Sequence, residues 1–222
     1  MHIPDGILST PVMVVTNTIS LTAVGFVWKR IRQSFTQNTI PKVALLAAFL
    51  FVAQMINIPV LGGTSAHLVG ATLTVLIVGP AMGIFVLILI LTVQMLIFQD
   101  GGLFAWGANV LNIGILPVIV SYLFLLFYYK ISQKYSRDLP LRALSIFITA
   151  WISIQAGALL CGLELGLSGL APLQKIVSVM MVVHSVHGIL EGILTVLIFE
   201  LIMANRPDLI FSFFAKSGLV HE

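Results

Sequence analysis

Charged residues and cysteine are scarce in this chain of 222 residues. Asp, Glu, Lys and Arg together make up 9% of the sequence and hydrophobic residues 59%, whereas a soluble domain is roughly one quarter charged. That composition excludes an ordinary soluble globule, and it also excludes disorder, which needs low hydrophobicity and high charge. The single cysteine, Cys161, excludes an intramolecular disulfide framework and a cysteine-rich zinc site.

Long apolar runs are abundant instead, and they predict an all-α polytopic membrane protein that forms one integral membrane domain over residues 1–222. A membrane-crossing helix needs roughly 20 apolar residues, and seven runs come close to that length. Gly79-Pro80 separates the third run from the fourth, and the third run is short. The predicted transmembrane helices are 11–28, 42–57, 66–79, 82–98, 107–129, 142–162 and 174–203.

The basic residues predict the orientation. With seven spans, every Lys and Arg except Lys175 falls on one side of the membrane. The positive-inside rule then places the N-terminus outside and the C-terminus in the cytoplasm. We therefore expect an external tail over residues 1–10, a helical bundle over 11–203, and a cytoplasmic tail over 204–222, in a multi-pass protein of the cell membrane. Because the basic residues serve orientation, we expect no nucleic-acid partner.

The targeting and phosphate-binding motifs of other protein classes are also missing. No basic stretch precedes the first apolar run, so we expect no cleavable signal peptide. No Gly-Lys-Ser/Thr phosphate-binding loop is present, so we expect no ATP hydrolysis, and no His-Glu-x-x-His pattern is present, so we do not expect an enzyme such as an intramembrane metalloprotease. Active transport by this chain would need an ion gradient or a partner.

The external tail carries a set of nitrogen ligands. His2 is too large for removal of Met1 by methionine aminopeptidase, so the chain is expected to keep a free amine, followed by an amide nitrogen and an imidazole. These three nitrogens close two chelate rings in one plane, and His67 on the same face is the candidate for the fourth position. Square-planar nitrogen coordination suits Ni(II) or Cu(II). An uninformative Met-His start and an ordinary helix-start histidine remain the alternative reading of the same residues.

Four motifs in order along the chain resemble the nickel/cobalt substrate-binding (S) component of energy-coupling factor (ECF) transporters, the NikM/CbiM family. These motifs are Met1–Gly6, Gly62–Leu68, Phe98–Leu103 and His187–Gly192. The resemblance implies seven helices, with an extra N-terminal helix before a six-helix core. It implies that Met1, His2 and His67 hold Ni2+ or Co2+ as the transported substrate, without a further cofactor. The motifs do not distinguish the two metals.

The same resemblance implies partner proteins. The family works with a transmembrane coupling protein and two ATP-binding-cassette ATPases, often with a further small membrane subunit. Ala44 and Ala48, one helical turn apart in the second span, are similar to an alanine motif that contacts the coupling protein. Internal packing of small residues between helices is the alternative interpretation.

Ionisable residues within the last span need a separate explanation. His184, His187 and Glu191 share one helical face because they are three and four residues apart. We interpret them as a hydrogen-bonded network, and a second metal or transit site and a proton path are the alternatives; a proton-coupled secondary metal transporter that uses them is the rival function. The residues predicted to support the site are Asp5, Ser65, Asp100, Asn112, His184, His187 and Glu191.

Overall fold

A computed structural model describes residues 1–37, 39–56, 58–60, 64–132 and 139–211. Gly62 and Gly63 of the second motif, and most of the predicted cytoplasmic tail, therefore lie outside the described residues. The elements follow in this order: α1 (Thr10–Ile31), α2 (Thr39–Met55), β1 (Ile58–Val60), β2 (Thr64–Ala66), α3 (Ala71–Val78), α4 (Pro80–Phe98), α5 (Trp106–Asn109), a π-helical turn (Val110–Ile115), α6 (Leu116–Ser132), α7 (Leu139–Leu167), α8 (Leu173–Asn205) and a 3-10 turn (Pro207–Leu209).

Five helical segments are long and apolar enough to cross a membrane: α1, α4, the run from α5 through α6, α7 and α8. The predicted helical, multi-pass membrane protein is thereby confirmed. α2 has 17 residues, and α3 has only 8 residues, which span about 12 Å at 1.5 Å per residue. Since the hydrocarbon core is about 30 Å thick, α3 does not cross it by itself. The count of seven spans stays a prediction.

A short hairpin lies between the second and third predicted spans. Strand β1 pairs antiparallel with β2, in the register Ile58↔Ala66 and Val60↔Thr64. Each strand has only 3 residues, too few for an alternating pattern to be recognised. The hairpin ends immediately before His67, so it delivers the chain to that residue.

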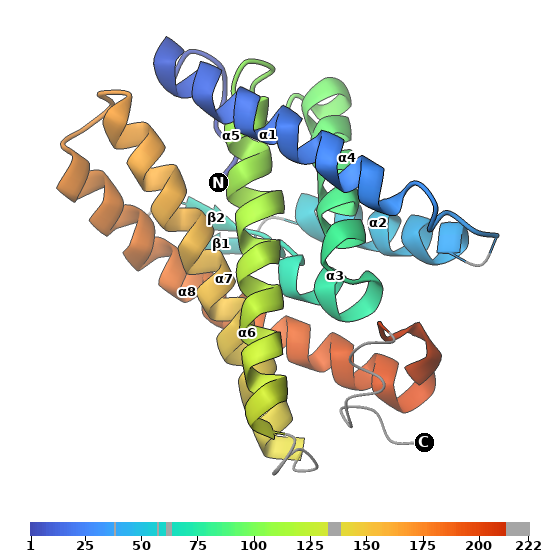
Figure 1. Ribbon diagram of the computed structural model, residues 1–222. Coiled ribbons are helices and arrows are strands. Elements are labelled where there is room, and N and C mark those ends of the chain that lie inside the picture. The colour runs from blue at the N-terminus through green and yellow to red at the C-terminus, as the bar shows by residue number, and fades with distance from the viewer. Residues whose placement is uncertain (38, 57, 61–63, 133–138, 212–222) are drawn as a thin grey trace.

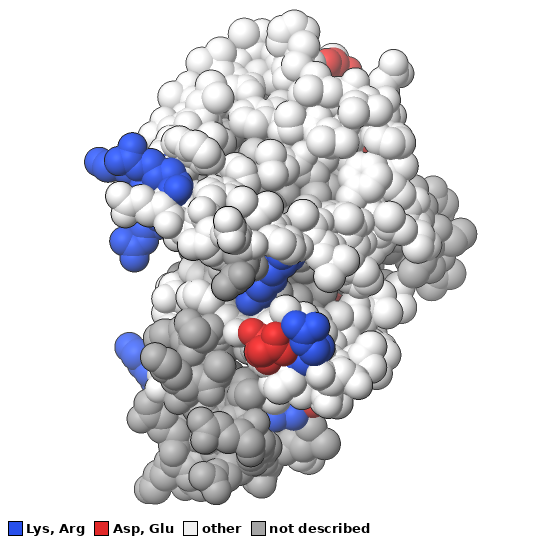
Figure 2. Space-filling model, turned by 90° about the vertical axis from the view of Figure 1, so that its right-hand side faces the viewer, with Lys and Arg blue, Asp and Glu red and all other residues white. Residues whose placement is uncertain are grey.

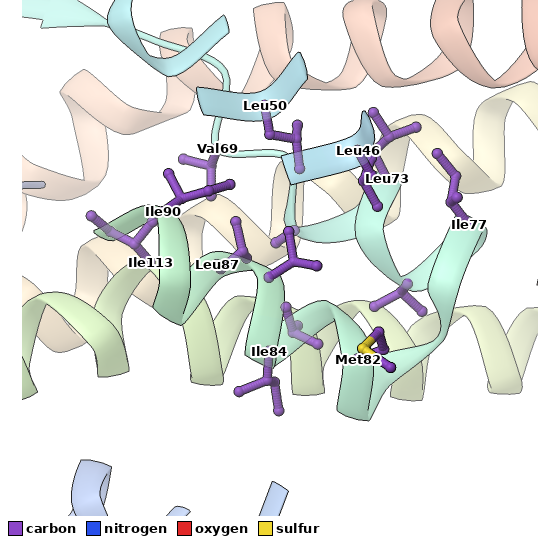
Figure 3. Packing of buried hydrophobic residues seen from close by; sticks show 14 of the residues in the cluster. Leu46, Leu50, Val69, Leu73, Ile77, Met82, Ile84, Leu87, Ile90 and Ile113 are labelled. Atoms are coloured by element: carbon purple, nitrogen blue, oxygen red, sulfur yellow. The ribbon is translucent and has the colours of Figure 1, made fainter. Parts of the chain in front are cut away.

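Helix α3 occupies the centre of the molecule. All of its residues from Ala71 to Ile77 are buried. Figure 3 shows Leu73 of this helix beside Leu46 of α2, and both belong to the same buried cluster as Leu87 of α4. Because its neighbours enclose it, α3 needs no lipid-facing length of its own and serves as an internal support for the preceding loop.

Two glycines set the ends of α3. Gly70 and Gly79 have φ values of +79° and +80°, in the left-handed region that L side chains rarely adopt. A Cβ atom on Gly70 would overlap the side chain of Leu50 from α2, and one on Gly79 would press on the ring of Phe211. The chain therefore turns sharply on both sides of α3 while neighbouring side chains pack directly on the backbone.

Helix α1 lies at the periphery and crosses the other helices obliquely (Figure 1). The side chain of Asn17 attaches it to the start of α5, since its amide donates to the carbonyl of Phe104 and accepts from the N–H of Gly107. Apolar side chains of α1 are exposed at Val14, Val15, Ile19, Leu21 and Phe26. That composition suits contact with lipid.

Helices α7 and α8 form an antiparallel pair (Figure 1). Aromatic side chains of α7 cover glycines of α8, so that Trp151 lies over Gly188 and Phe147 over Gly192. The close approach directs the polar face of α8 inward, and His184, His187 and Glu191 are buried.

Candidate metal site

The N-terminal tail turns into the bundle (Figure 1). Asn109 at the end of α5 holds its main chain: the amide oxygen accepts from the N–H of Ile3 at 2.7 Å, and the amide nitrogen donates to the carbonyl of Ile3 at 3.0 Å. The same carbonyl accepts from the N–H of Gly102 at 2.9 Å. The side chain of Ile3 is buried with Leu8. These contacts fix the tail with Met1 innermost.

Asp5 fixes the loop that receives the tail. Its carboxylate accepts main-chain hydrogen bonds from Leu103, Phe104 and Ala105 at 2.9, 2.8 and 3.2 Å. Gly102 lies so close to Asp5 that a Cβ atom there would collide with the carboxylate. Asp5, which the sequence predicts to support the site, therefore joins the tail to the segment before α5.

The imidazoles of His2 and His67 lie together at the inner end of the tail. Their ring centroids are 5.2 Å apart, with the planes at 61°. Both ring nitrogens of His2 are buried, and neither has a hydrogen-bond partner among the described residues. The nearest carboxylate is Asp100, whose Oδ1 is 3.5 Å from Nδ1 of His2. Buried nitrogens without partners are unusual in proteins, and they are free to bind a ligand.

Burial disfavours the protonated forms of these groups. It lowers the pKa of His2 to about 4, and the adjacent amino group adds to the effect. Burial also lowers the pKa of the Met1 amino group, and it brings the pKa of His67 well below its ordinary value. Because a metal ion binds the neutral forms of these groups, each of these shifts favours coordination.

The polar face of α8 contacts the main chain around His67. Nε2 of His187 lies 2.5 Å from the carbonyl oxygen of His67, and the two rings are 5.9 Å apart. The carboxylate of Glu191 accepts from the N–H groups of Val69 and Gly70 at 2.7 and 2.8 Å. His187 and Glu191 thus hold the segment between β2 and α3.

His184 lies beside His187 in the row of imidazoles. Its ring centroid is 5.6 Å from that of His187. Its Nδ1 lies 2.8 Å from the carbonyl oxygen of Met180, one turn earlier in α8. The four histidines His2, His67, His187 and His184 therefore form one series of neighbouring rings.

Two further predicted residues lie in the π-helical turn and in β2. Asn112 belongs to the π-helical turn and donates to Glu164 of α7 at 2.5 Å, a residue that follows the predicted span 142–162. Glu164 instead lies within α7 and is buried. Ser65 lies in β2, opposite Pro59, and its side chain is outside the described part.

Several contributing residues were not predicted. Gln54 of α2 donates to the carbonyl of Val69 at 3.0 Å, and Gln94 of α4 donates to Gln54 at 2.9 Å. Both glutamines are buried in apolar helices. A buried amide in a membrane segment is a sequence signal in itself, but its partner was not recognisable.

Within the described residues, no group of three or more His, Cys, Asp or Glu side chains is arranged to hold a metal ion. The ligand set predicted here uses only two side chains of these types, together with the terminal amine and a main-chain nitrogen. The alanines predicted to contact a partner, Ala44 and Ala48, are exposed on α2. Ala48 lines a shallow apolar groove with Phe51 of α2 and Val93 of α4.

The model of the family described as "Cobalt uptake substrate-specific transmembrane region", CbiM, matches residues 2–209. The chain belongs to the CbiM family. Its relatives include the putative fused nickel transport protein NikMN of Archaeoglobus fulgidus, which is 36% identical over 213 residues, 95% of this chain and 68% of the relative. The cobalt transport protein CbiM of Clostridium tetani is 31% identical over 205 residues, 91% of this chain and 84% of the relative.

A crystal structure described as a truncated transition metal transporter has the same fold as this CbiM-family chain. The TM-score is 0.80 at 32% sequence identity, over 92% of this chain and 99% of the other. The sequence-based assignment to the NikM/CbiM family is confirmed, as is a multi-pass membrane protein of metal transport. The relatives are named for nickel and for cobalt, so their names do not distinguish the two metals.

Proposed function

We propose that this CbiM-family protein is the substrate-binding component of an ECF-type importer, and that it captures Ni2+ or Co2+ at the outer face. The amine of Met1, the main-chain nitrogen and Nδ1 of His2, and a ring nitrogen of His67 are the ligands. The observation that carries the proposal is the 5.2 Å separation of the two imidazole centroids beside a buried amino terminus. Metal–nitrogen bonds are about 2 Å long, so one ion between these rings is within reach of both.

The ligand chemistry favours a divalent ion that prefers planar nitrogen coordination. The amine and the amide of Met1-His2 close a five-membered ring on the ion, and the amide and Nδ1 of His2 close a six-membered ring. The amide must lose its proton, which places a negative charge beside the ion, and Asp100 adds a second near Nδ1 of His2. The two negative charges offset those of a divalent cation in a buried site.

The residues around the ligands act as positioning groups in this proposal. Asn109 and Asp5 set the depth of the tail, and His187 and Glu191 set the position of the His67 segment. Release of the ion then requires the tail to withdraw, because a bare cation among apolar side chains is prohibitively costly. A partner ATPase module supplies the energy for that movement.

The rival function, proton-coupled transport through His184, His187 and Glu191, makes a different use of the same face of α8. In the proposed role, both oxygens of Glu191 are occupied by main-chain donors, which favours a structural part for it. Metal uptake by vesicles that hold this protein without any ATPase would favour the rival.

Calorimetry with Ni2+ and Co2+ tests the proposal. We expect binding by the untagged protein, whose retained Met1 is verified by intact mass. A short N-terminal extension should abolish binding, because the first nitrogen becomes an amide. His67→Ala should weaken binding strongly, whereas His221→Ala removes a histidine that the proposal leaves out and should have no effect. Undiminished affinity of the extended protein would overturn the ligand set.

A further inference from the structure

A cavity of about 920 Å³ opens at the end of the bundle opposite the tail. Four parts of the chain meet there: the end of α1, the start of α2, the turn between α3 and α4, and the segment after α8. Met1, His2 and His67 do not contribute to its wall, so the cavity is separate from the candidate metal site.

The wall of the cavity is basic. Arg30 of α1, Lys42 of α2 and Arg206 after α8 line it, and Asp208 is the one acidic residue among the lining positions of the described chain. Figure 2 shows Lys and Arg side chains in the middle of this face and along one edge, with one large acidic group among them and only small acidic areas elsewhere.

The one carboxylate is already engaged. Arg206 and Asp208 form a double hydrogen bond, at 2.9 Å from Nε and 2.8 Å from the terminal nitrogen. Lys42 is half-buried, and no carboxylate of the described residues lies within 4.0 Å of its ammonium group. Lys42 therefore has only a longer-range attraction to Asp208, which Arg206 already holds. Because three cations share one carboxylate among the described lining positions, the cavity has unmet capacity for negative charge.

The first turn of α4 adds main-chain donors at the same place. Ala81 and Met82 line the cavity together with Pro80, the first residue of α4, which has no N–H of its own. The first N–H groups of a helix have no partner within the helix, and the positive end of the helix dipole attracts anions. Basic side chains from three parts of the chain and the start of α4 therefore line the same cavity.

The geometry points to a binding site for a phosphate-bearing anion in this cavity. Phosphate oxygens accept hydrogen bonds from lysine, arginine and main-chain N–H groups together. The headgroup of an acidic phospholipid and a soluble phosphate share this chemistry, and basic pockets between membrane helices bind the former. The same charge repels a divalent cation, so the cavity is not a path for the metal.

The test uses the full chain in a neutral detergent with two probes, phosphatidylglycerol and inorganic phosphate, and with phosphatidylcholine as the reference lipid. Native mass spectrometry measures lipid retention, and thermal unfolding at constant ionic strength measures stabilisation by phosphate. The variants are Lys42→Gln, Arg30→Gln and the charge-preserving Lys42→Arg. Lys29→Gln is the matched control, since Lys29 neighbours Arg30 but is not in the wall. Equal Tm values in anion-free buffer verify folding.

We expect Lys42→Gln and Arg30→Gln each to bind the anion about fivefold more weakly, while Lys42→Arg and Lys29→Gln bind like the wild type. Preference for phosphatidylglycerol over phosphatidylcholine identifies a lipid headgroup, and stabilisation by inorganic phosphate alone identifies a soluble anion. Equal losses in Lys29→Gln and Lys42→Gln would reduce the effect to general surface attraction and overturn the site. Failure of both probes to bind would also overturn the site, even if Lys42→Gln were found to lose a protein partner.

Discussion

Nε2 of His187 lies 2.5 Å from the main-chain carbonyl oxygen of His67. A carbonyl oxygen only accepts, so this ring carries its proton on Nε2. The contact connects the longest helix of the protein, α8, to the segment that holds a candidate ligand. The position of His67 is thus set by a residue 120 positions away in the sequence.

Glu191→Gln tests this support. The carboxamide can accept from only one of the two N–H groups of Val69 and Gly70, and its own N–H₂ group then faces a donor. We expect the Tm to fall and the free energy of unfolding to drop by about 1–3 kcal/mol, with weaker Ni2+ binding in calorimetry. Glu200→Gln is the control, because Glu200 pairs with Arg142 at a distance from the site. Equal effects of the two variants on nickel affinity would contradict the assigned role of Glu191.

Asp5→Asn tests the anchoring of the tail. The substitution removes the charge from a group that accepts three main-chain hydrogen bonds, so we expect a mobile tail. The measurement is the rate of N-terminal proteolysis, which should rise, together with nickel affinity, which should fall roughly tenfold if about 1.4 kcal/mol of tail fixation is lost. Asp208→Asn removes an exposed carboxylate from the other end of the chain, and it should change neither quantity.

Metal binding releases protons, and their number reports how far the ligands are protonated in the metal-free protein. The pKa of His2 is lowered to about 4 and that of the Met1 amine is also lowered, so the folded protein carries fewer protons on its ligands than an open peptide does. At pH 6 we expect nickel to displace fewer protons from the protein than from a free Met-His-Ile peptide, whose amine and imidazole are largely protonated. Calorimetry in buffers of different ionisation enthalpy measures the difference. Equal release by protein and peptide would contradict a buried, neutral site.

Ala48→Trp tests the predicted contact with the coupling protein. Ala48 is exposed on α2 beside an apolar groove, so an indole there should block a close helix contact but spare folding. We expect loss of the coupling protein from a pull-down, with nickel affinity unchanged. Val15→Trp, on the exposed side of α1, is the matched control and should retain the partner. Normal assembly of the Ala48 variant would place the contact elsewhere.

Thiol labelling tests the orientation. Cys161, the native cysteine, is buried, so single cysteines can be introduced at Ser34 and Leu170 against a low background. An impermeant maleimide on intact cells should modify Leu170→Cys, in the turn between α7 and α8, but should reach Ser34→Cys only after permeabilisation. The reverse pattern would place the amino terminus inside and remove the proposed site from the outer face.

The apolar runs predicted the helices closely, because length and hydropathy are local properties. The runs 82–98 and 107–129 correspond to α4 and to the segment from α5 through α6. The run 66–79 was less well predicted, since α3 begins only at Ala71. Its apolar residues serve internal packing, and a buried helix has the same composition as a lipid-facing one.

The supporting residues of the site were harder to predict, because their partners are far apart in sequence. Glu164 fell just after the predicted span 142–162, yet Asn112, 52 positions earlier, pairs with it inside the bundle. The π-helical turn that presents Asn112 has no signature in its residues, Val110–Ile115. Met1, His2 and His67 were predicted from their ligand chemistry together with the family resemblance, and the fold brings the two imidazoles together.

The two anchors of the tail also constrain its length. Asn109 hydrogen-bonds the main chain of Ile3, and Asp5 hydrogen-bonds the segment before α5. His2 is therefore one residue away from a fixed position of the chain. One residue inserted between His2 and Ile3 would move the imidazole by about 3.5 Å, which is farther than a coordination bond is long. The number of residues before Ile3 is consequently as much a part of the site as the identity of His2.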